Sequence, residues 1–426
     1  MAGAAPDGGS AAHGGPGRGA LPVVPSAWRG RRVLLGVTGG IAAYKAIQLA
    51  RDLTLRGAIV DVVLTRTARE FVGAISFEGV TGRVVHADLV AEGHALAHIR
   101  LAREADVVCI APATADFLAR AAAGRADDLI TAILLATRAP VVICPAMNDA
   151  MWAHPATVAN ADRLVALGYT LLGPVIGPLA VGEGEGPGRL VEPAIILEHL
   201  ARITQPDNPL RGRRVVVTAG PTREAVDPVR VLSNRSSGRM GYAIAAAAWR
   251  RGADVTLITG PTELTPPAGP RLVRIESADQ MEDAVRHALP EAQVLVMAAA
   301  VADFRPTTPV TQKIRKSSRP DAIQLEGAPD VLASTIDARP ADLFVVGFAL
   351  ESGDGRESAR EKLERKALDL IVLNSASEAG AGFETETNRV VLIRRGTSDE
   401  ELPVLPKTDV AELLLDRVAA ALEAAS

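Results

Sequence analysis

Apolar residues along the first half of the chain fall into short, nearly unbroken runs separated by longer amphipathic stretches. Four such runs cover residues 33–38, 59–65, 107–111 and 141–145. Unbroken apolar runs are typical of parallel strands that are covered on both faces, because neither face meets water. Helical periodicity lies between them, as in 41–56 and 114–123. The pattern predicts a doubly wound α/β domain.

The second half repeats this pattern. Strand-like runs cover 215–218, 255–259, 294–298, 344–347 and 370–373, followed by a hairpin around 390–394 and an amphipathic helix over 410–422. Between 304 and 330 the apolar residues follow neither a helical nor a strand periodicity, and basic residues such as Lys313 and Arg315 cluster there. We therefore expect an α/β protein of two doubly wound, Rossmann-like domains, the second of which carries a basic loop.

Composition shifts suggest the domain boundaries. Residues 1–28 are rich in Gly, Ala and Pro and lack the apolar segment of a signal peptide, so they predict a disordered tail. The first domain is expected over 29–204, a Pro-containing linker over 205–212 and the second domain over 213–426. Segment 173–188 is dense in Gly and Pro and shows no period, which predicts a functional loop.

Charge and cysteine content exclude several classes. A net charge of −4 gives no electrostatic argument for nucleic acid, and no apolar run is long enough to span a bilayer. Cys109 and Cys144 alone argue against a disulfide scaffold and fit a cytoplasmic protein. The seven histidines lack metal-ligand spacing, so we expect no zinc. Small-molecule partners remain.

Each half opens with a strand that runs into glycine and then into a helix. In the first half Gly39 and Gly40 would let the backbone approach a phosphate at a helix N-terminus. A tight turn with no ligand explains these two residues almost as well. Loops 111–116 and 145–148 end two further strands, where open α/β sheets bind ligands. Their small residues leave room for a flat ring.

The second half carries its own candidate chemistry in segment 227–238. Arg230 and Asn234 could bind an oxyanion, although Ser236 or Ser237 could simply cap the following helix. Three further sets of residues suit a triphosphate: Asp303 at a strand end, Lys313 on the basic loop, and Lys362 with Lys366 one helical turn apart. The two lysines could equally belong to a solvated helix. Together these groups suit nucleotidyl transfer.

The motifs, taken together, resemble one family. The first half contains Thr-Gly-Gly-Ile-Ala-Ala-Tyr-Lys at 38–45, Ala-Pro-Ala-Thr-Ala-Asp at 111–116 and Pro-Ala-Met-Asn at 145–148. The second contains Thr-Ala-Gly-Pro-Thr-Arg-Glu at 218–224, Ala-Ala-Val-Ala-Asp at 299–303 and Lys-Ile-Arg-Lys at 313–316. The chain resembles the bifunctional phosphopantothenoylcysteine decarboxylase/phosphopantothenate–cysteine ligases of coenzyme A biosynthesis from about residue 32 to the C-terminal helix.

For the first half the resemblance implies a flavodoxin-like domain that binds FMN, oxidises the cysteinyl thiol of its substrate and releases carbon dioxide. His98 matches the active-site histidine of the family, and Asn148 matches the asparagine that holds the substrate carboxylate. The residues implied to border the flavin are Gly39, Gly40, Ile41, Thr65, Ala111, Pro112, Ala113 and Thr114.

For the second half the resemblance implies that CTP and Mg²⁺ convert phosphopantothenate to an acyl-cytidylate, from which the amine of cysteine displaces CMP. Asn234, Arg230 and Lys313 match catalytic positions, and Asp303 is a candidate Mg²⁺ ligand. The implied CTP contacts are Met297, Ala298, Ala299, Asp303, Lys313, Pro329, Asp330, Val331, Leu332, Phe348, Lys362 and Lys366. The resemblance further implies a homo-oligomer with trimeric flavin domains and dimeric ligase domains.

One departure from the family pattern bears on the chemistry. Val181 stands where the family usually has a cysteine that donates a proton to the unsaturated intermediate. Either another group donates this proton, with Glu183 and Glu185 nearby in sequence, or the reaction stops at an unsaturated product. We expect saturation to occur. Smaller departures are Ala367 and Ser375, where the family commonly has asparagine and aspartate.

Two other functions are open to test. A flavin-binding regulatory protein that keeps only the ligase activity would fit the loss of the cysteine, although the intact ligase motifs argue against it. A nicotinamide-dependent oxidoreductase ranks last. Neither glycine turn has the Gly-x-Gly-x-x-Gly pattern, and no acidic residue closes the second strand of either half.

Overall fold

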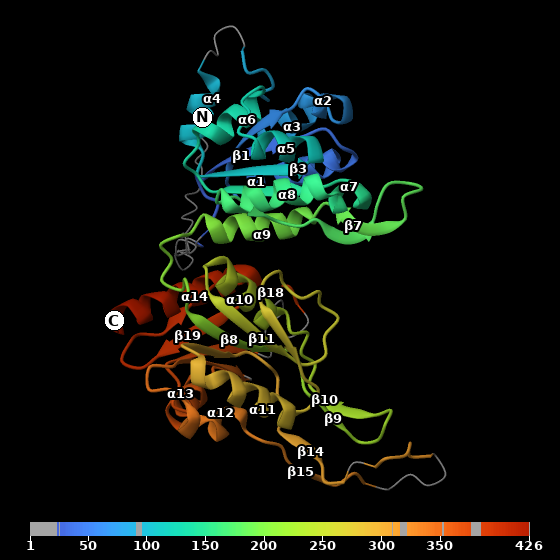
Figure 1. Cartoon of the computed structure of the whole chain (residues 1–426). Helices are drawn as coiled ribbons and strands as arrows, with labels where there is room; N and C mark the ends of the chain where they lie inside the picture. Colours follow the sequence, from blue (N-terminus) through green and yellow to red (C-terminus); the bar gives the residue numbers. More distant parts are fainter. Residues whose placement is uncertain are drawn as a thin grey trace, which may run out of the picture.

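The computed structural model describes residues 24, 26–90, 96–308, 310–315, 322–351, 353–375 and 385–425. The chain folds into two α/β domains that lie one above the other in Figure 1. Nearly all of the expected tail lies outside the described residues, as do Lys316 and Arg319 of the basic loop. Within this part of the chain no helix is both long and apolar enough to cross a membrane.

The first domain is built on a five-stranded parallel sheet in the order β2-β1-β3-β4-β5. This is the flavodoxin-like order, so the expected fold is confirmed. The strands are β1 (Arg32–Val37), β2 (Ile59–Leu64), β3 (Val107–Ala113), β4 (Val141–Pro145) and β5 (Thr170–Leu171). Helices cover both faces, which explains why the strands are apolar throughout.

One face of this sheet is covered by α1 (Tyr44–Leu55), α3 (Ala74–Thr81) and α9 (Pro193–Ile203). The other is covered by α4 (Ala97–Glu104), α5 (Ala115–Ala122), α6 (Leu129–Ala136) and α8 (Pro155–Ala166). Two short helices, α2 (Ala68–Phe71) and α7 (Asp149–Ala153), follow β2 and β4.

The second domain has an eight-stranded sheet in the order β12-β11-β8-β13-β16-β17-β19-β20. The first six strands are parallel to one another, β19 runs antiparallel to them, and β20 pairs antiparallel with β19. Their bounds are β8 (Arg214–Ala219), β11 (Asp254–Thr259), β12 (Arg271–Arg274), β13 (Val294–Met297), β16 (Phe344–Glu351), β17 (Leu370–Ser375), β19 (Val390–Arg394) and β20 (Glu400–Glu401). The parallel part has the Rossmann order.

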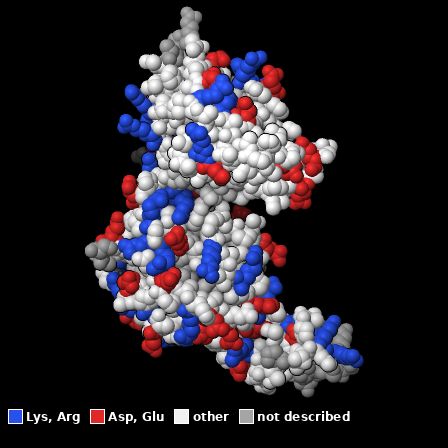
Figure 2. All heavy atoms as spheres, in the orientation of Figure 1, with Lys and Arg blue, Asp and Glu red and all other residues white. Residues whose placement is uncertain are grey.

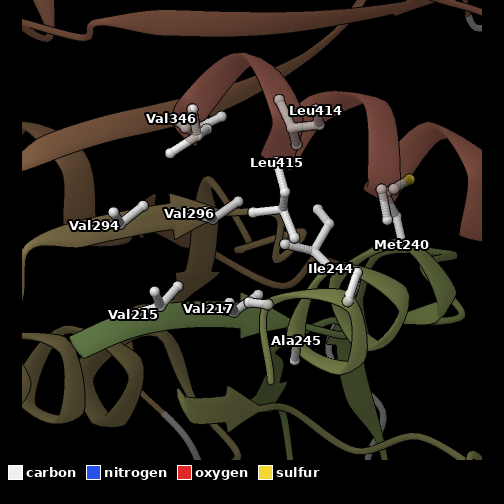
Figure 3. Close-up of a cluster of buried hydrophobic side chains, with 14 of the residues drawn as sticks. Val215, Val217, Met240, Ile244, Ala245, Val294, Val296, Val346, Leu414 and Leu415 are labelled. Carbon is white, nitrogen blue, oxygen red and sulfur yellow. The ribbon is translucent and has the colours of Figure 1, made fainter. Parts of the chain in front are cut away.

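Helices α10 (Arg239–Arg250) and α14 (Lys407–Ala425) pack together on one face of the second sheet. Figure 3 shows Met240 and Ile244 of α10 near Leu414 and Leu415 of α14, beside the valines of the strands. The opposite face carries α11 (Ala278–Ala288), α12 (Val331–Ser334) and α13 (Arg356–Arg365). The two helix layers therefore begin on either side of the carboxyl edge of the sheet.

Three hairpins extend from the domains in Figure 1: β6 (Val175–Pro178) with β7 (Glu185–Arg189), β9 (Arg223–Ala225) with β10 (Val231–Ser233), and β14 (Phe304–Pro306) with β15 (Leu325–Gly327). The first corrects the expectation of an irregular loop over 173–188. The glycines in the strands of this hairpin hid the alternation of apolar and polar side chains that identifies a strand. They stand where neighbouring atoms leave no room for a side chain. A Cβ on Gly188 would lie 2.1 Å from the Met147 carbonyl oxygen.

The domain boundaries also shift. Trp28, expected in the tail, is 3% exposed in the core of the first domain, and Leu210, expected in the linker, is fully buried in the core of the second. The Arg250 guanidinium of α10 lies 2.7 Å from Glu198 of α9, across the joint, and 2.6 Å from Glu412 of α14, within its own domain. The two domains are therefore held by charge pairs as well as by the linker.

Candidate functional sites

A cavity of about 520 Å³ lies at the carboxyl edge of the first sheet. The turn after β1, the loop after β3, the loop after β4 and the β6–β7 hairpin line it. The Thr38 hydroxyl donates to the Pro112 carbonyl (2.8 Å) and accepts from the Thr114 N–H (3.0 Å). These bonds fix two of the loops against each other, as a preformed ligand site requires.

Gly39 is required by its surroundings. A Cβ built on it would lie 2.4 Å from Thr67 Cγ2 and 2.7 Å from the Thr67 carbonyl carbon. The corresponding atom on Gly40 would meet only Thr114 Cγ2, at 3.7 Å, so this position is open. Both glycines line the cavity. The backbone at Gly40 is therefore open toward the cavity.

Two cations that sequence reasoning did not select face this cavity. Lys45 and Arg189 line it, and both bind Glu192, at 2.9 and 2.6 Å. The hydrogen bond from Lys45, with a further one from Arg189, holds the pKa of Glu192 below its usual range. One carboxylate thus fixes two positive charges, and the surplus charge suits an anionic group. Lys45 stood in the glycine motif, but Arg189 is distant in sequence.

The two candidate acids of the β6–β7 hairpin differ in their position relative to the cavity. Glu183 lines the cavity and Glu185, the first residue of β7, does not. Val181 is fully exposed at the hairpin and is not among the lining residues. Figure 2 shows acidic atoms on this projecting hairpin. The structure therefore brings one carboxyl of the pair to the site.

Most of the expected flavin residues gather here, and some do not. Gly39, Gly40, Ile41, Pro112 and Thr114 line the cavity together with Asn148. Thr65, Ala111 and Ala113 are buried behind it, and the Thr65 hydroxyl accepts from the Ala68 N–H at the start of α2. Their role is to hold the loops.

His98 lies elsewhere. It is the second residue of α4 and borders a separate cavity of about 490 Å³ with Val90 and Leu135. Its Nδ1 atom is buried and has no hydrogen-bond partner among the described residues. Val90 and Leu135 are 86% and 58% exposed. Within one chain, therefore, His98 and Asn148 do not share a cavity.

A second cavity, of about 430 Å³, lies at the carboxyl edge of the second sheet. It contains Asn234, whose side-chain amide donates to the Ala300 and Val301 carbonyls at 3.2 and 3.1 Å. The expected nucleotide contacts that line it are Met297, Ala298, Ala299, Asp303, Pro329, Asp330, Val331, Leu332, Phe348, Lys362 and Lys366. These residues come from four segments that the fold brings to one edge.

Lys362 of α13 and Lys366, which directly follows this helix, are not simply solvated side chains. The Lys362 ammonium donates to the Phe348 carbonyl (2.8 Å), and burial, reinforced by Lys366, lowers the pKa of Lys362. Lys366 lies 2.7 Å from Asp330. Although burial opposes the change, the hydrogen bond from Lys366 and that from the Ala333 N–H lower the pKa of Asp330.

The start of α10 differs from the expected serine cap. Gly238, with φ +78°, is the residue that precedes the helix, and the Ser236 hydroxyl accepts from the Gly238 N–H at 3.3 Å. Ser236, Ser237 and Gly238 all line the cavity. The segment therefore presents backbone and hydroxyl groups to a ligand at a helix N-terminus.

Arg230 and Lys313 do not line this cavity. The Arg230 guanidinium lies 2.6 Å from the buried Asp227 and donates to the Ile314 carbonyl (3.2 Å). Ile314 N–H in turn donates to Asp227 (3.1 Å). The structure thus joins Arg230 to the segment that carries Lys313, on an arm that extends away from the domain in Figure 1.

Four polar residues of the second cavity were missed. Arg239, Asn374, Asn388 and Lys407 line it. Asn388 and Lys407 are brought together because β18 (Thr387–Asn388) pairs with β21 (Leu405–Pro406) directly before α14. No short motif reveals such a pairing. Among the described residues, no three His, Cys, Asp or Glu side chains form a metal-binding group.

Fold and cavities together define a two-domain α/β protein with a separate cavity at the carboxyl edge of the sheet in each domain. Residues 24–204 match the family described as Flavoprotein, and residues 210–422 match the DNA/pantothenate metabolism flavoprotein C-terminal domain. The coenzyme A biosynthesis bifunctional protein CoaBC of Vibrio cholerae is 44% identical over 390 residues, covering 91% of this chain and 97% of the relative. That of Mycolicibacterium smegmatis is 47% identical, covering 92% and 98%.

A crystal structure of the C-terminal domain of a CoaBC protein is 37% identical and covers 51% of this chain and 99% of that one, with a TM-score of 0.44. The chain belongs to the family of bifunctional coenzyme A biosynthesis proteins. It is an enzyme with two activities, a flavin-dependent decarboxylase and a ligase.

Proposed function

We propose that the second domain joins cysteine to phosphopantothenate with CTP, through an acyl-cytidylate, and that the first domain decarboxylates the product to phosphopantetheine with FMN. The observation that carries this proposal is the pair of cavities, each at the carboxyl edge of a sheet beside a glycine turn and each lined by cationic side chains. CTP-dependent release of pyrophosphate, with phosphopantothenate and cysteine, tests the ligase. Absorbance of bound flavin tests the cofactor.

FMN fits the first cavity because the open side of Gly40 and the fixed charges of Lys45 and Arg189 suit its phosphate. When bound, it would supply two-electron oxidation of the substrate thiol and return these electrons after carbon dioxide leaves. Gly39, Gly40 and the Pro112–Thr114 turn would hold it. Asn148 would orient the substrate carboxylate toward departure, and His98 would take the thiol proton.

We propose Glu183 as the proton donor that replaces the cysteine. It is the one carboxylic acid that lines the first cavity among the described residues. Glu183 would donate a proton to the carbon that lost carbon dioxide, and the flavin, when bound, would supply the hydride that the neighbouring carbon needs, so the product would be saturated. Mass spectrometry of the product formed by the full chain tests this assignment.

Glu183→Gln is expected to release a product two hydrogens lighter than phosphopantetheine, whereas the matched control Glu185→Gln releases the saturated product. The lighter product from the unsubstituted protein would contradict saturation altogether. Saturated product from both variants would contradict the assignment to Glu183. Absence of either product from the unsubstituted protein would favour the regulatory alternative.

We propose that a second copy of the first domain completes the decarboxylase site, in a trimer. The support is the position of His98, which is separate from the cavity of Asn148 and has a buried, unpartnered Nδ1 beside exposed apolar residues. Two inactive variants, His98→Asn and Asn148→Ala, should regain decarboxylase activity when co-expressed. Continued inactivity of an assembled mixture would refute a shared site.

A dimer of ligase domains follows from the same kind of observation. Arg230 and the arm of Lys313 are tied to each other and lie outside the cavity of Asn234, so we propose that the arm reaches the cavity of the partner. Co-expression of Lys313→Gln with Asn234→Asp should restore ligase activity. If it does not, Lys313 acts within its own chain.

Asp303 would hold Mg²⁺, which would supply positive charge to the phosphates of CTP, because Mg²⁺ is usually bound by one or two protein carboxylates together with substrate phosphates. Chelation should abolish ligase activity and leave the decarboxylase unchanged. A ligase that works in excess EDTA would exclude this role. The buried thiols Cys109 and Cys144 support a reducing, cytoplasmic setting.

A further inference from the structure

The turn that follows α13 adopts a conformation that its own residue disfavours. The Ala367 N–H donates to the Glu364 carbonyl (3.1 Å), and the next N–H along the chain donates to the Leu363 carbonyl (2.9 Å). These two bonds define the Schellman motif, which places the residue after the helix cap in the left-handed region and favours glycine or asparagine there. Ala367 occupies this position with φ +47°. The turn therefore depends on its surroundings to keep this conformation.

One guanidinium, that of Arg339, binds this turn. Its Nη1 atom donates to the Lys366 and Ala367 carbonyls, at 2.9 and 3.0 Å. The last carbonyls of a helix have no intrahelical partner, and a cation near them is favoured by the helix dipole. The Nη2 atom of the same guanidinium donates to the Leu332 carbonyl in α12. A single side chain therefore links the end of α13 to α12.

Both of the linked segments form part of the cavity in the second domain. Leu332 and Lys366 line it, as does Asp330, the residue that caps α12. The Lys366 ammonium lies 2.7 Å from the Asp330 carboxylate, so an ion pair joins the two segments at the cavity. Arg339 is not among the lining residues. It therefore holds this wall of the cavity without forming part of the lining itself.

The bonds of Arg339 are made in a partly desolvated position. Its Nε is buried and has no hydrogen-bond partner among the described residues, and such an N–H is costly. Burial lowers the pKa of Arg339, although Asp369 opposes the change. A lysine would keep the charge, but its donors share one nitrogen, whereas the planar fork of arginine reaches two separate helices. The link between the Leu332 and Lys366 carbonyls therefore requires arginine.

We propose that Arg339 is a positioning residue of the ligase, which fixes the Ala367 turn and thereby holds Lys366 against Asp330 in the arrangement that the nucleotide requires. The proposal rests on the proposed ligase function. Without the guanidinium, the turn would relax from its positive φ and move the Lys366 backbone with it. We expect this wall to contact the nucleotide equally in the ground state and the transition state. Its loosening should therefore raise the KM for CTP and leave kcat unchanged.

Steady-state ligase kinetics of the full chain, with Mg²⁺ present, test this role. Arg339→Met should raise the KM for CTP about 3- to 30-fold, with kcat and the KM values for cysteine and phosphopantothenate within about twofold of the unsubstituted protein. Arg339→Lys should behave similarly, because it keeps the charge and loses the fork.

Arg286→Met is the matched control. Arg286 donates to the Ser334 carbonyl at the end of α12, and its second partner, Glu282, belongs to its own helix α11. This variant therefore loosens α12 without breaking a link to α13, and its KM for CTP should stay within about twofold of the unsubstituted value.

Ala367→Asn in the Arg339→Met background tests the route through the turn. Asparagine adopts the left-handed region more readily than alanine, so the turn should need less support, and the raised KM for CTP should fall back to within about twofold of the unsubstituted value. If Arg339 served stability alone, Arg339→Met would lower the Tm and leave the KM for CTP unchanged.

An unchanged KM for CTP in Arg339→Met would overturn the proposal, as would an equal rise for all three substrates or a lowered kcat at unchanged KM. An equal rise in Arg286→Met would overturn it by showing that any loosening of α12 has this effect. A KM that stays raised after Ala367→Asn would overturn the route through the turn. Thermal unfolding checks that each variant folds, and Arg339→Lys keeps the test valid if Arg339→Met does not. Failure of the ligase function itself would instead appear as no CTP-dependent product from the unsubstituted protein.

Discussion

Substitution of Gly39 by alanine tests how closely the turn after β1 packs against Thr67. The added Cβ would lie 2.4 Å from Thr67 Cγ2, 2.6 Å from Thr67 Cβ and 2.7 Å from the Thr67 carbonyl carbon. A rotamer change could remove the first of these contacts, but the other two involve atoms fixed to the backbone. The turn or the start of α2 must therefore move in Gly39→Ala.

Overpacking of this kind destabilises proteins by about 1–3 kcal/mol. For a domain of this size 1 kcal/mol corresponds to roughly 2–4 °C in Tm, so Gly39→Ala should lower the Tm of the first domain by about 2–12 °C. Differential scanning calorimetry of the flavin-free full chain follows this transition. The flavin content of the purified protein should fall as well, because the displaced turn lines the cavity.

Gly40→Ala is the matched control, since its new Cβ would find its nearest neighbour at 3.7 Å. Its flavin-free Tm should stay within about 1 °C of the unsubstituted protein. An unchanged Tm and full flavin content in Gly39→Ala would refute the steric argument. Thr67→Gly in the Gly39→Ala background should restore part of the lost stability, because it removes Thr67 Cγ2 and Thr67 Cβ. The restoration should be incomplete, because the carbonyl carbon of residue 67 stays 2.7 Å from the added Cβ.

Three further substitutions or conditions follow from the same structure. Ala367 has φ +47°, so Ala367→Gly or Ala367→Asn should raise the unfolding free energy by about 0.5–1 kcal/mol, and an unchanged or lower Tm would contradict this. CTP should raise the lowered pKa values of Lys362 and Lys407, so binding should take up protons at pH values below the usual lysine range and weaken as pH rises; equal binding heats in buffers of different ionisation enthalpy would contradict this. Arg250→Met should separate the two domain transitions in calorimetry, because it removes the pair with Glu198 that crosses the joint; superimposed transitions would show that this pair is dispensable.

The fold could be predicted because its strands are buried on both faces. Continuous apolar runs such as 107–111 and 294–298 leave little choice of structure, and both form central strands. The β6–β7 hairpin could not be predicted in this way. Its backbone pairing involves Gly177, Gly186 and Pro178, which carry none of the alternation that identifies a strand.

The candidate sites were predictable where a short motif holds several residues together. Gly39, Pro112 and Asn148 each close a strand of one parallel sheet, so their common position at one edge follows from the topology. Lys407 and Asn388 depend instead on a two-residue antiparallel pairing that no local pattern reveals. The position of His98 could not be derived either, because the resemblance names a role and says nothing about which cavity of a single chain contains it.

The joint between the domains limits how the two activities can be dissected. Val24 packs against the core of the second domain, whereas Trp28 is buried in the core of the first, so the N-terminal segment crosses the joint. A ligase fragment that begins after Leu210 would lose a fully buried core residue, and any ligase fragment loses the cover of Val24 and the Glu198 partner of Arg250. Rates measured on separated halves would therefore describe enzymes with altered cores, and inactivating one site within the intact chain is the sounder way to study the other.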